Sequence, residues 1–435
     1  MATGKIIVIG GGPAGLMAAG QAATAGADVL LLEKMTRPAR KLGITGKGRC
    51  NLTNSTALDQ FMEHFGKNGR FLRQAFNSFF SNDLVEFLNK LGIETTTERG
   101  GRIFPIDNDA VAVADAMIKW ARGCGVSIRT RSPVEWLLQE GDHIVGVQVP
   151  REPKTALASP LTKAATKFRT DGKLYKADAV ILATGGKSYP ATGSTGEGYK
   201  LAEKVGHTIN TPRPALVPLE TKAAMPEVLV GLHLKNVNVS LYIDAKKCGG
   251  DFGEVKFEPY GLDGPSVVAL SKLAVAALEK KQRVEISIDL KPALDNNKLD
   301  ARLLRDFKEF GKRRYGKILK ELLPMQLIPI CMQQTKINPE RHGNQVTSDE
   351  RRKLRLWLKD FRWTISGHRG FKEAIITSGG IPVSEINPRT MESKILKGLY
   401  LAGEIIDIDA DTGGYNLQAA FSTGYLAGVS AAKGN

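Results

Sequence analysis

The chain has 435 residues and a formal net charge of +16, with 42% hydrophobic and 24% charged residues. This length is too great for one compact core and predicts two or three domains, and the composition is that of an ordinary globular protein. No apolar run approaches the roughly 20 residues of a membrane span, and the N-terminus lacks the features of a signal peptide. Its 4 cysteines are far apart and its 6 histidines show no paired spacing. We therefore expect a cytoplasmic protein without membrane contact, disulfides or a metal site.

The positive charge is concentrated in three stretches. Residues 150–176, 301–325 and 351–372 carry net charges of +5, +5 and +7. Such patches can attract nucleic acid, phosphorylated ligands or acidic partners. Because no known nucleic-acid module accompanies them, solvated helix faces are the favoured interpretation. Nucleic-acid binding stays an alternative.

The N-terminal segment Lys5–Glu33 predicts a dinucleotide site. Ile6–Ile9 is a β-branched apolar run typical of a buried parallel strand. A G-x-G-x-x-G spacing follows, and a helix rich in small residues leads to a second apolar strand, Asp28–Leu32. In this context the glycines permit a tight turn, the approach of a pyrophosphate and close helix–strand packing. Glu33 can accept hydrogen bonds from a ribose. A glycine-rich turn that binds nothing is the alternative.

The next segments continue an α/β pattern. The loop Arg40–Asn54 is basic and rich in glycine and asparagine, and it follows the second strand, so we expect it beside the dinucleotide. Arg151–Lys173 has no hydrophobic period and predicts a long surface loop. The other predicted elements are a helix over Phe71–Leu91, a strand pair over Ile93–Pro105, a helix over 109–122, a strand over Val126–Arg129, a hairpin over 134–149, a strand over Asp178–Leu182 and a helix over Gly196–Val205.

The βαβ-like spacing of strands and helices stops near residue 195 and resumes near residue 367. We place the first part of the nucleotide-binding domain at residues 1–195, an inserted domain at 196–366 and the C-terminal part at 367–435. Short strands followed by helices are typical of an α+β domain. The predicted elements of the insertion are strands over Leu216–Thr221, Asn236–Ile243 and Gly253–Glu258 and a helical bundle over about 267–358, with helices at Val267–Lys280, Lys298–Leu323 and Ser348–Leu358. Those of the C-terminal part are strands over Glu373–Thr377 and Leu399–Ala402 and a small-residue-rich helix over Tyr415–Ala432.

Several motifs together resemble a known family. The motifs are IIVIGGGPAGLMAA, GKGRCNLTN, ILATGG, YPATGSTGEGY, PALVPLE, YGLDGP and the run from Thr377 to Gly428 that contains TGGYNLQ. The chain is similar, nearly end to end, to the YhiN/BaiN-like flavoproteins, often described as NAD(P)/FAD-dependent oxidoreductases or aminoacetone oxidase family FAD-binding enzymes. Lys47 and the insertion 151–173 depart from the family pattern. The resemblance implies non-covalent FAD and a Rossmann-like FAD-binding domain, split by an inserted α+β domain with a β-barrel-like region and a small helical bundle.

The resemblance also implies which residues meet FAD. Those at the pyrophosphate are Gly10, Gly12, Ala14 and Gly15. Those at the adenosine half are Glu33, Ala183, Thr184 and Gly185. Those at the ribityl chain and the ring are Lys41, Gly46, Gly48, Arg49, Cys50, Asn51, Gly403, Glu404, Asp407, Gly414, Tyr415, Asn416 and Leu417. Pro13, Lys34 and Val134 complete the set. A helix that starts at Asn416 would aim its N–H groups at the negative charge of a reduced flavin.

The expected function is hydride transfer between flavin N5 and a small organic substrate. Amine oxidation and reduction of a conjugated ketone both fit the resemblance. NAD(P)H could be a donor, but without a second G-x-G-x-x-G it would have to dock transiently. The alternatives are an RNA-associated flavoprotein that uses the basic stretches and a flavin-binding protein without turnover.

We assign no catalytic residue from the sequence. Cys50 lacks a nearby second cysteine, so we interpret it as a packed residue. Tyr189 and Tyr415 could donate a proton, but packing or ring stacking is favoured for both. His368 is interpreted as a domain-junction residue. The sequence does not identify the substrate, the direction of hydride transfer, the choice of NADH or NADPH, or the oligomeric state.

Overall fold

The computed structural model describes residues 4–150 and 172–434. The chain divides into two compact units: unit 1 is Met1–Pro214 with Ile375–Asn435, and unit 2 is Ala215–Ala374. The predicted class, a Rossmann-like domain split by an inserted α+β domain, is confirmed. The boundaries expected at 195/196 and 366/367 remain sequence-based predictions. The predicted loop over 151–173 lies, apart from its last two residues, outside the described residues, as does most of the basic stretch 150–176. In the described part of the chain, no helix is both long and apolar enough to cross a bilayer.

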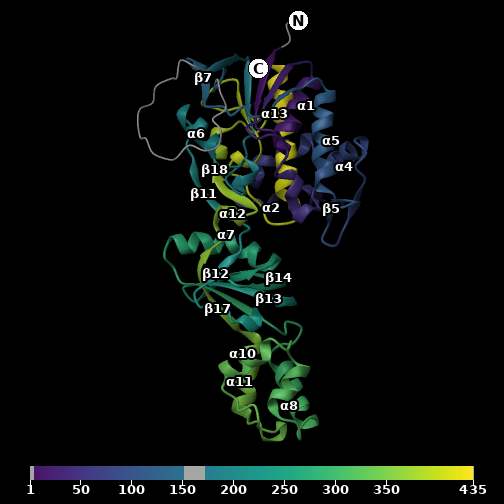
Figure 1. Cartoon of the computed structure of the whole chain (residues 1–435), viewed down its shortest axis with the longest axis vertical. Helices are drawn as coiled ribbons and strands as arrows, with labels where there is room; N and C mark the ends of the chain where they lie inside the picture. Colours follow the sequence, from purple (N-terminus) through teal and green to yellow (C-terminus); the bar gives the residue numbers. More distant parts are fainter. Residues whose placement is uncertain (1–3, 151–171, 435) are drawn as a thin grey trace. The chain divides into compact units, whose positions relative to one another are not determined.

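Unit 1 is built on a five-stranded parallel sheet of order β19-β10-β1-β2-β6. The central strand β1 is buried on both faces after Lys5, as expected for an apolar strand in a parallel sheet. Helices α1, α5 and α13 belong to the same core (Figure 1). The bounds are Lys5–Ile9 (β1), Asp28–Leu32 (β2), Ser127–Arg129 (β6), Ala179–Leu182 (β10), Leu399–Leu401 (β19), Pro13–Thr24 (α1), Ala110–Gly123 (α5) and Tyr415–Lys433 (α13).

Helices α1 and α13 make direct backbone contact. A Cβ added to Gly424 would lie 2.3 Å from the Ala14 carbonyl oxygen, and one added to Gly428 would lie 2.3 Å from that of Ala18. Both contacts advance four residues in the same direction, so the two helices run parallel. Helix α13 starts at Tyr415, well before its contact residue Gly424, whereas α1 starts at Pro13, directly before its contact residue Ala14. At about 1.5 Å of rise per residue, the N-terminus of α13 therefore extends about 12 Å beyond that of α1.

Three smaller sheets and further helices complete unit 1. The sheets have the orders β3-β5-β4, β7-β8-β9 and β11-β18. Their strands are Thr53–Asn54 (β3), Thr95–Thr97 (β4), Arg102–Pro105 (β5), Trp136–Glu140 (β7), His143–Val149 (β8), Lys173–Lys176 (β9), Asn210–Ala215 (β11) and Ile376–Gly380 (β18). The helices are Leu58–Glu63 (α2), Arg73–Ser78 (α3), Ser81–Lys90 (α4) and Glu197–Lys204 (α6). The short helix Gly370–Glu373 (α12) belongs to unit 2.

The helix predicted over Phe71–Leu91, with Asn82 or Ser81 as an N-cap, is interrupted at its centre, because Phe79 and Phe80 are extended and α4 begins at Ser81 after the N-cap Phe80. The Phe79 ring stacks on Tyr425 at a centroid distance of 4.9 Å. The Phe80 N–H donates to the Asp83 carboxylate at 2.7 Å and so caps α4. Ring packing and this cap outweigh local helix propensity.

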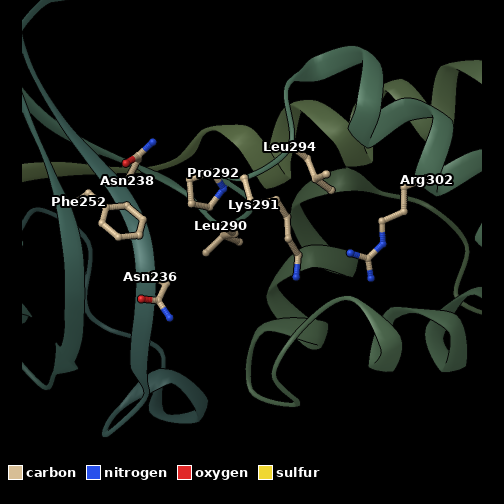
Figure 2. Close-up of a pocket in the computed structure, with 9 residues that line it drawn as sticks. Asn236, Asn238, Phe252, Leu290, Lys291, Pro292, Leu294 and Arg302 are labelled. Carbon is tan, nitrogen blue, oxygen red and sulfur yellow. The ribbon is translucent and has the colours of Figure 1, made fainter.

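Unit 2 contains a closed barrel of order β12-β15-β14-β13-β16-β17, in which β17 also pairs with β12. Its strands are Leu219–Thr221 (β12), His233–Ile243 (β13), Lys246–Glu258 (β14), Gly261–Asp263 (β15), Val284–Asp289 (β16) and Phe361–His368 (β17). Helix α7, Pro265–Glu279, packs on β14 and β13 of this barrel rather than on the other helices. A loop after β16 borders a pocket, which is drawn in Figure 2.

The remaining helices of unit 2 form a small bundle. They are Asn296–Glu309 (α8), Tyr315–Ile318 (α9), Leu327–Thr335 (α10) and Ser348–Lys359 (α11). The single helix predicted over Lys298–Leu323 is wrong, because the chain turns between α8 and α9. The Gly343 N–H donates to the Arg313 carbonyl at 3.0 Å, and the Tyr315 side chain is fully buried. These long-range contacts fix the turn.

Candidate functional site

The turn between β1 and α1 has the three glycine environments that a pyrophosphate site requires. A Cβ on Gly10 would lie 2.6 Å from the Ala183 carbonyl oxygen, and one on Gly15 would lie 1.9 Å from the Gly10 carbonyl oxygen. A Cβ on Gly12 would meet no protein atom within 4 Å. The protein's own packing therefore requires Gly10 and Gly15, whereas Gly12 leaves its backbone open to a ligand. Pro13 begins α1, which has no side-chain cap, so the N–H groups of its first turn can bind phosphate.

Glu33 follows β2 and is buried. Its Oε2 accepts the Gly11 N–H at 2.7 Å, and its Oε1 accepts the Met35 N–H at 2.7 Å. Each carboxylate oxygen retains a further acceptor position, so Glu33 can still accept a ribose hydroxyl. The Glu33 carbonyl accepts the Ser132 N–H at 2.9 Å, which places the loop that contains Val134 beside this position.

The segment after β10 lies next to the first turn. The Ala183 N–H donates to the Ile9 carbonyl at 2.9 Å and continues the parallel pairing. The Thr184 hydroxyl is buried, and no group in the described residues pairs with it. Since buried hydroxyls normally have a partner, this orphan oxygen is a candidate ligand contact. Gly185 follows with φ of +72°.

The N-terminus of α13 is a second open helix end. Gly414 precedes it, and a Cβ there would lie 2.4 Å from the Thr53 carbonyl oxygen. The Asn51 amide, in the orientation that pairs both of its atoms, donates to that Thr53 oxygen at 3.2 Å and accepts the Gly414 N–H at 3.0 Å. No side chain caps α13. The first-turn N–H groups that this leaves without an intrahelical acceptor belong to Tyr415, Asn416 and Leu417.

These features fit FAD. Two uncapped helix N-termini lie about 12 Å apart along parallel axes, which suits a ligand with a pyrophosphate at α1 and a ring system at α13. The space beside Gly12 and the orphan hydroxyl of Thr184 both lie at the α1 end. The residues present thus fit the group on geometry and on donor chemistry.

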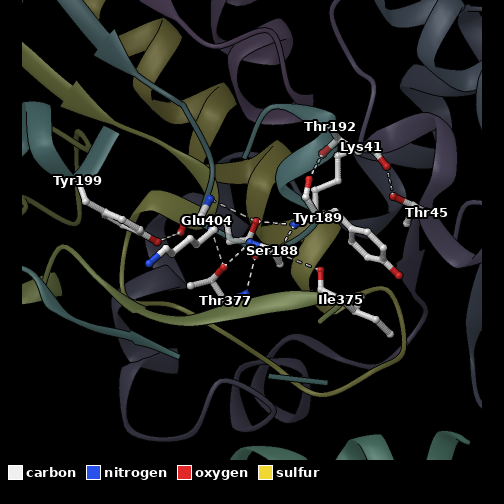
Figure 3. A network of polar contacts seen from close by, with 11 residues as sticks. Lys41, Thr45, Ser188, Tyr189, Thr192, Tyr199, Ile375, Thr377 and Glu404 are labelled. Carbon is white, nitrogen blue, oxygen red and sulfur yellow. Dashed lines mark hydrogen bonds and ion pairs between the residues drawn. The ribbon is translucent and has the colours of Figure 1, made fainter. Parts of the chain in front are cut away.

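A polar network around Glu404 joins distant segments (Figure 3). Glu404 Oε2 accepts from Lys41 Nζ at 2.8 Å, and its Oε1 accepts the Thr377 N–H at 2.7 Å. Lys41 Nζ also donates to the Ser188 hydroxyl at 2.7 Å, and that hydroxyl donates to Glu404 Oε1 at 3.1 Å. The network therefore fixes the Arg40–Asn54 loop against the segments that follow β10 and β19.

Four other residues of the expected set use their side chains on protein groups. The partners are Thr195 and Glu197 for Lys34, Glu98 and Asn108 for Arg49, Asn210 and Gly379 for Asp407, and Ala410 and Asp411 for Asn416. Ligand contacts from these side chains would compete with the hydrogen bonds and ion pairs that these side chains already make to other protein groups. The remaining members of the set lie in short 3-10 helices, Gly46 and Gly48 in Leu42–Gly48 and Gly403 in Gly403–Ile405.

Cys50 is fully buried, and burial raises the pKa of its thiol to about 12. The thiolate, which is the reactive form, is therefore essentially absent near neutral pH. This agrees with a packed residue rather than a redox thiol.

We expect Cys50 to resist iodoacetamide in the native protein at about pH 8, where an unperturbed thiol already reacts. Cys248, which is exposed, should be alkylated under the same conditions. Because the pKa of Cys50 is raised, labelling should stay low up to about pH 10. Peptide mass spectrometry of native and denatured samples checks this. Equal labelling of both cysteines in the native protein would contradict it.

The sequence interpretation missed His64, which directly follows α2 and lies against the first residue of α13. Its ring stacks on Tyr415 with a centroid distance of 3.8 Å and an interplanar angle of 19°. Its Nδ1 lies 3.1 Å from Asp411 Oδ2, and 347 residues separate the two. Nε2 has no hydrogen-bond partner among the described residues. No local pattern could reveal a pair so distant in sequence.

The chain matches known proteins along its whole length. The HI0933-like protein Rossmann domain matches residues 4–430. A 3-dehydro-bile acid delta(4,6)-reductase from Clostridium scindens is 31% identical over 431 residues, 99% of either chain. A ribosomal RNA dihydrouridine synthase from Escherichia coli is 29% identical over 426 residues, 96% of either chain.

Solved structures share the fold. A 3-ketosteroid-delta4-(5alpha)-dehydrogenase from Rhodococcus jostii RHA1 aligns with a TM-score of 0.54 and 15% identity, over 99% of this chain and 97% of that chain. A 3-ketosteroid delta1-dehydrogenase from Sterolibacterium denitrificans aligns with a TM-score of 0.51 and 13% identity, over 100% of both chains. Together with the family match and the two open helix ends, this places the chain in the HI0933-like family of FAD-binding Rossmann flavoproteins, the YhiN/BaiN type, as an FAD-dependent oxidoreductase.

Proposed function

We propose that the chain reduces a carbon–carbon double bond that is conjugated to a carbonyl group. The names of both relatives describe this bond change. In a 3-dehydro bile acid the delta-4,6 double bonds are conjugated to the 3-keto group, and in uridine the C5–C6 double bond is conjugated to the C4 carbonyl. The observation that carries the proposal is that both relatives cover at least 96% of this chain.

When bound, FAD supplies the hydride in such reactions. Once a hydride has reached the β-carbon, the substrate needs a proton at the α-carbon and hydrogen-bond donors at the carbonyl oxygen. His64 is our candidate proton donor, because Asp411 can hold its Nδ1 while Nε2 stays available to a substrate. Stacking on Tyr415 fixes the plane of the ring.

Product analysis under anaerobic turnover tests the proposal. The FAD-loaded protein is mixed with NADH or NADPH and with either 2-cyclohexenone or a uridine-containing RNA. We expect cyclohexanone or dihydrouridine as the product, and no reaction of an unconjugated cyclohexene alcohol. Failure to reduce either conjugated substrate, together with consumption of a primary amine and oxygen in a parallel aerobic assay, would favour amine oxidation and contradict the proposal.

Of the two substrate classes that the relatives name, charge favours RNA. Residues 296–359, which contain α8 to α11, have 16 Lys and Arg against 7 Asp and Glu, a net +9. The rest of unit 2 has 13 of each. Within unit 2 the excess therefore belongs to the helical bundle alone, and a polyanion is the natural partner of such a surface.

A further inference from the structure

A pocket of about 470 Å³ lies within unit 2 (Figure 2). One wall is the outer face of barrel strands β13 and β14, and another is the loop Leu290–Leu294 that follows β16. Arg302 of α8 closes a third side. The pocket thus joins the barrel to the basic bundle inside one compact unit.

The barrel wall offers an aromatic ring and two amides. Asn238 pairs with Phe252 in the β13–β14 register, so the two side chains share a face. Asn236 stands at a bulge between Leu234 and Val237 with φ of +56°, and a bulge re-aims a side chain. Phe252 is 55% exposed. A flat ligand that stacks on this ring would remove its apolar surface from water.

The other two sides of the pocket each offer a positive charge, Lys291 on the loop and Arg302 on α8. The Lys291 ammonium makes no ion pair with any described residue, and burial together with the charge of Arg302 lowers its pKa. Arg302 Nε forms a long ion pair with Asp306 Oδ2 of the same helix, at 3.6 Å. In Figure 2 both cationic ends lie on the same side of the loop. An anion between them would relieve their repulsion and be held by both.

The loop that carries Lys291 is already fixed in place. Lys359 Nζ donates to the Leu294 carbonyl at 2.8 Å and to the Lys291 carbonyl at 3.3 Å. The same ammonium pairs with Asp289 at 2.5 Å. Ligand binding therefore costs little conformational entropy for ordering the Leu290–Leu294 loop.

The positive surface continues beyond the pocket onto the bundle. Several exposed basic residues of the bundle make no ion pair among the described residues. These include Arg305, Lys308, Lys312, Lys320, Arg352 and Lys353. A free nucleotide would use only the pocket, whereas an RNA strand would also neutralise this surface.

We propose that this pocket binds one nucleotide of a single-stranded RNA. The base stacks on Phe252, the amides of Asn236 and Asn238 bond to its edge, and a phosphate lies between Lys291 and Arg302. The neighbouring nucleotides run over the bundle. This deepens the proposed function by naming RNA as the substrate class and rests on it, because tethering RNA to the chain raises its effective concentration at the FAD-dependent site.

Fluorescence anisotropy of a labelled single-stranded, uridine-rich RNA with the FAD-loaded full chain tests the pocket. We expect F252L to weaken binding about tenfold, because stacking on the ring is lost. The double variant K291Q/R302Q should weaken binding and reduce the slope of log K against log salt by about 0.7, since the two side chains hold one phosphate and each phosphate contact on a single strand contributes about 0.7.

Matched controls separate the pocket from diffuse charge. L304A removes an apolar side chain that is 53% exposed on α8, much like Phe252, and should not alter affinity. K320Q/K353Q removes two bundle charges away from the pocket and should weaken binding less than threefold. An equal loss in both double variants, no RNA binding by the unmodified protein, or displacement of RNA by stoichiometric NADPH would each overturn the proposal.

A second readout covers the case in which a variant is destabilised. RNA that contains 4-thiouridine should crosslink to peptides of β14 and of the Leu290–Leu294 loop in the unmodified protein, and crosslinks confined to other segments would overturn the pocket. Neither assay needs turnover. Their failure is therefore separate from failure of the proposed reaction, which 2-cyclohexenone tests without RNA.

Discussion

Replacing Gly12 with alanine should leave the protein folded but weaken its affinity for FAD by roughly 10- to 100-fold, or about 1–3 kcal/mol, the typical cost of overpacking. The added methyl would meet no protein atom within 4 Å, so the change barely affects the fold. It would occupy the space that a pyrophosphate needs beside the N-terminus of α1. Titration of the apo-protein with FAD, followed by calorimetry, measures the affinity, and thermal unfolding of the apo-protein measures the stability.

The control for Gly12→Ala is Gly123→Ala at the end of α5. A Cβ there would also meet nothing within 4 Å, but this position is outside the site. We expect its affinity for FAD to match that of the unmodified protein. If G12A bound FAD as tightly as G123A does, the pyrophosphate would not pass this turn.

Replacing His64 with asparagine should lower kcat for reduction of a conjugated substrate about 100-fold, the usual scale of a lost general acid. Asparagine can still bond to Asp411 but carries no acidic proton. The protein should keep its FAD, and the rate at which NAD(P)H bleaches the flavin should change little, because that half-reaction does not use the proton. Stopped-flow absorbance separates the two half-reactions.

His233→Asn is the matched control for His64→Asn. His233 also pairs with a carboxylate, with its Nε2 2.8 Å from Glu254 Oε2, and it lies in the barrel of unit 2. We expect H233N to turn over at the unmodified rate. Equal kcat values for H64N and the unmodified protein would remove His64 as the proton donor.

The local parts of the fold and site could be predicted from the sequence. The first βαβ unit was readable because the apolar strand, the glycine spacing and Glu33 lie within thirty residues, where period and turn chemistry act directly. The start of α13 was also predicted at Tyr415, since two glycines precede a helix rich in small residues. The barrel-like region was implied by resemblance, and the structure shows a closed barrel.

The features that depend on distant contacts could not be predicted. A helix start near Ser81 was locally readable, but the stacking of Phe79 on Tyr425 at the break joins residues that no local window contains. The His64–Asp411 pair joins residues 347 positions apart. The Lys41–Glu404 pair joins residues 363 positions apart. In each case tertiary packing decides the geometry, and the sequence shows only that suitable side chains are present.

The central claim is that the FAD-dependent chemistry reduces conjugated double bonds, and single-turnover reoxidation tests it most directly. The protein is photoreduced without oxygen and mixed with 2-cyclohexenone, with a uridine-containing RNA, or with cyclohexanone as the saturated control. The claim predicts that at least one conjugated substrate restores the oxidised flavin spectrum and gains two hydrogen atoms per flavin, while cyclohexanone does neither. A flavin that stays reduced with both conjugated substrates but is reoxidised rapidly by oxygen would contradict it.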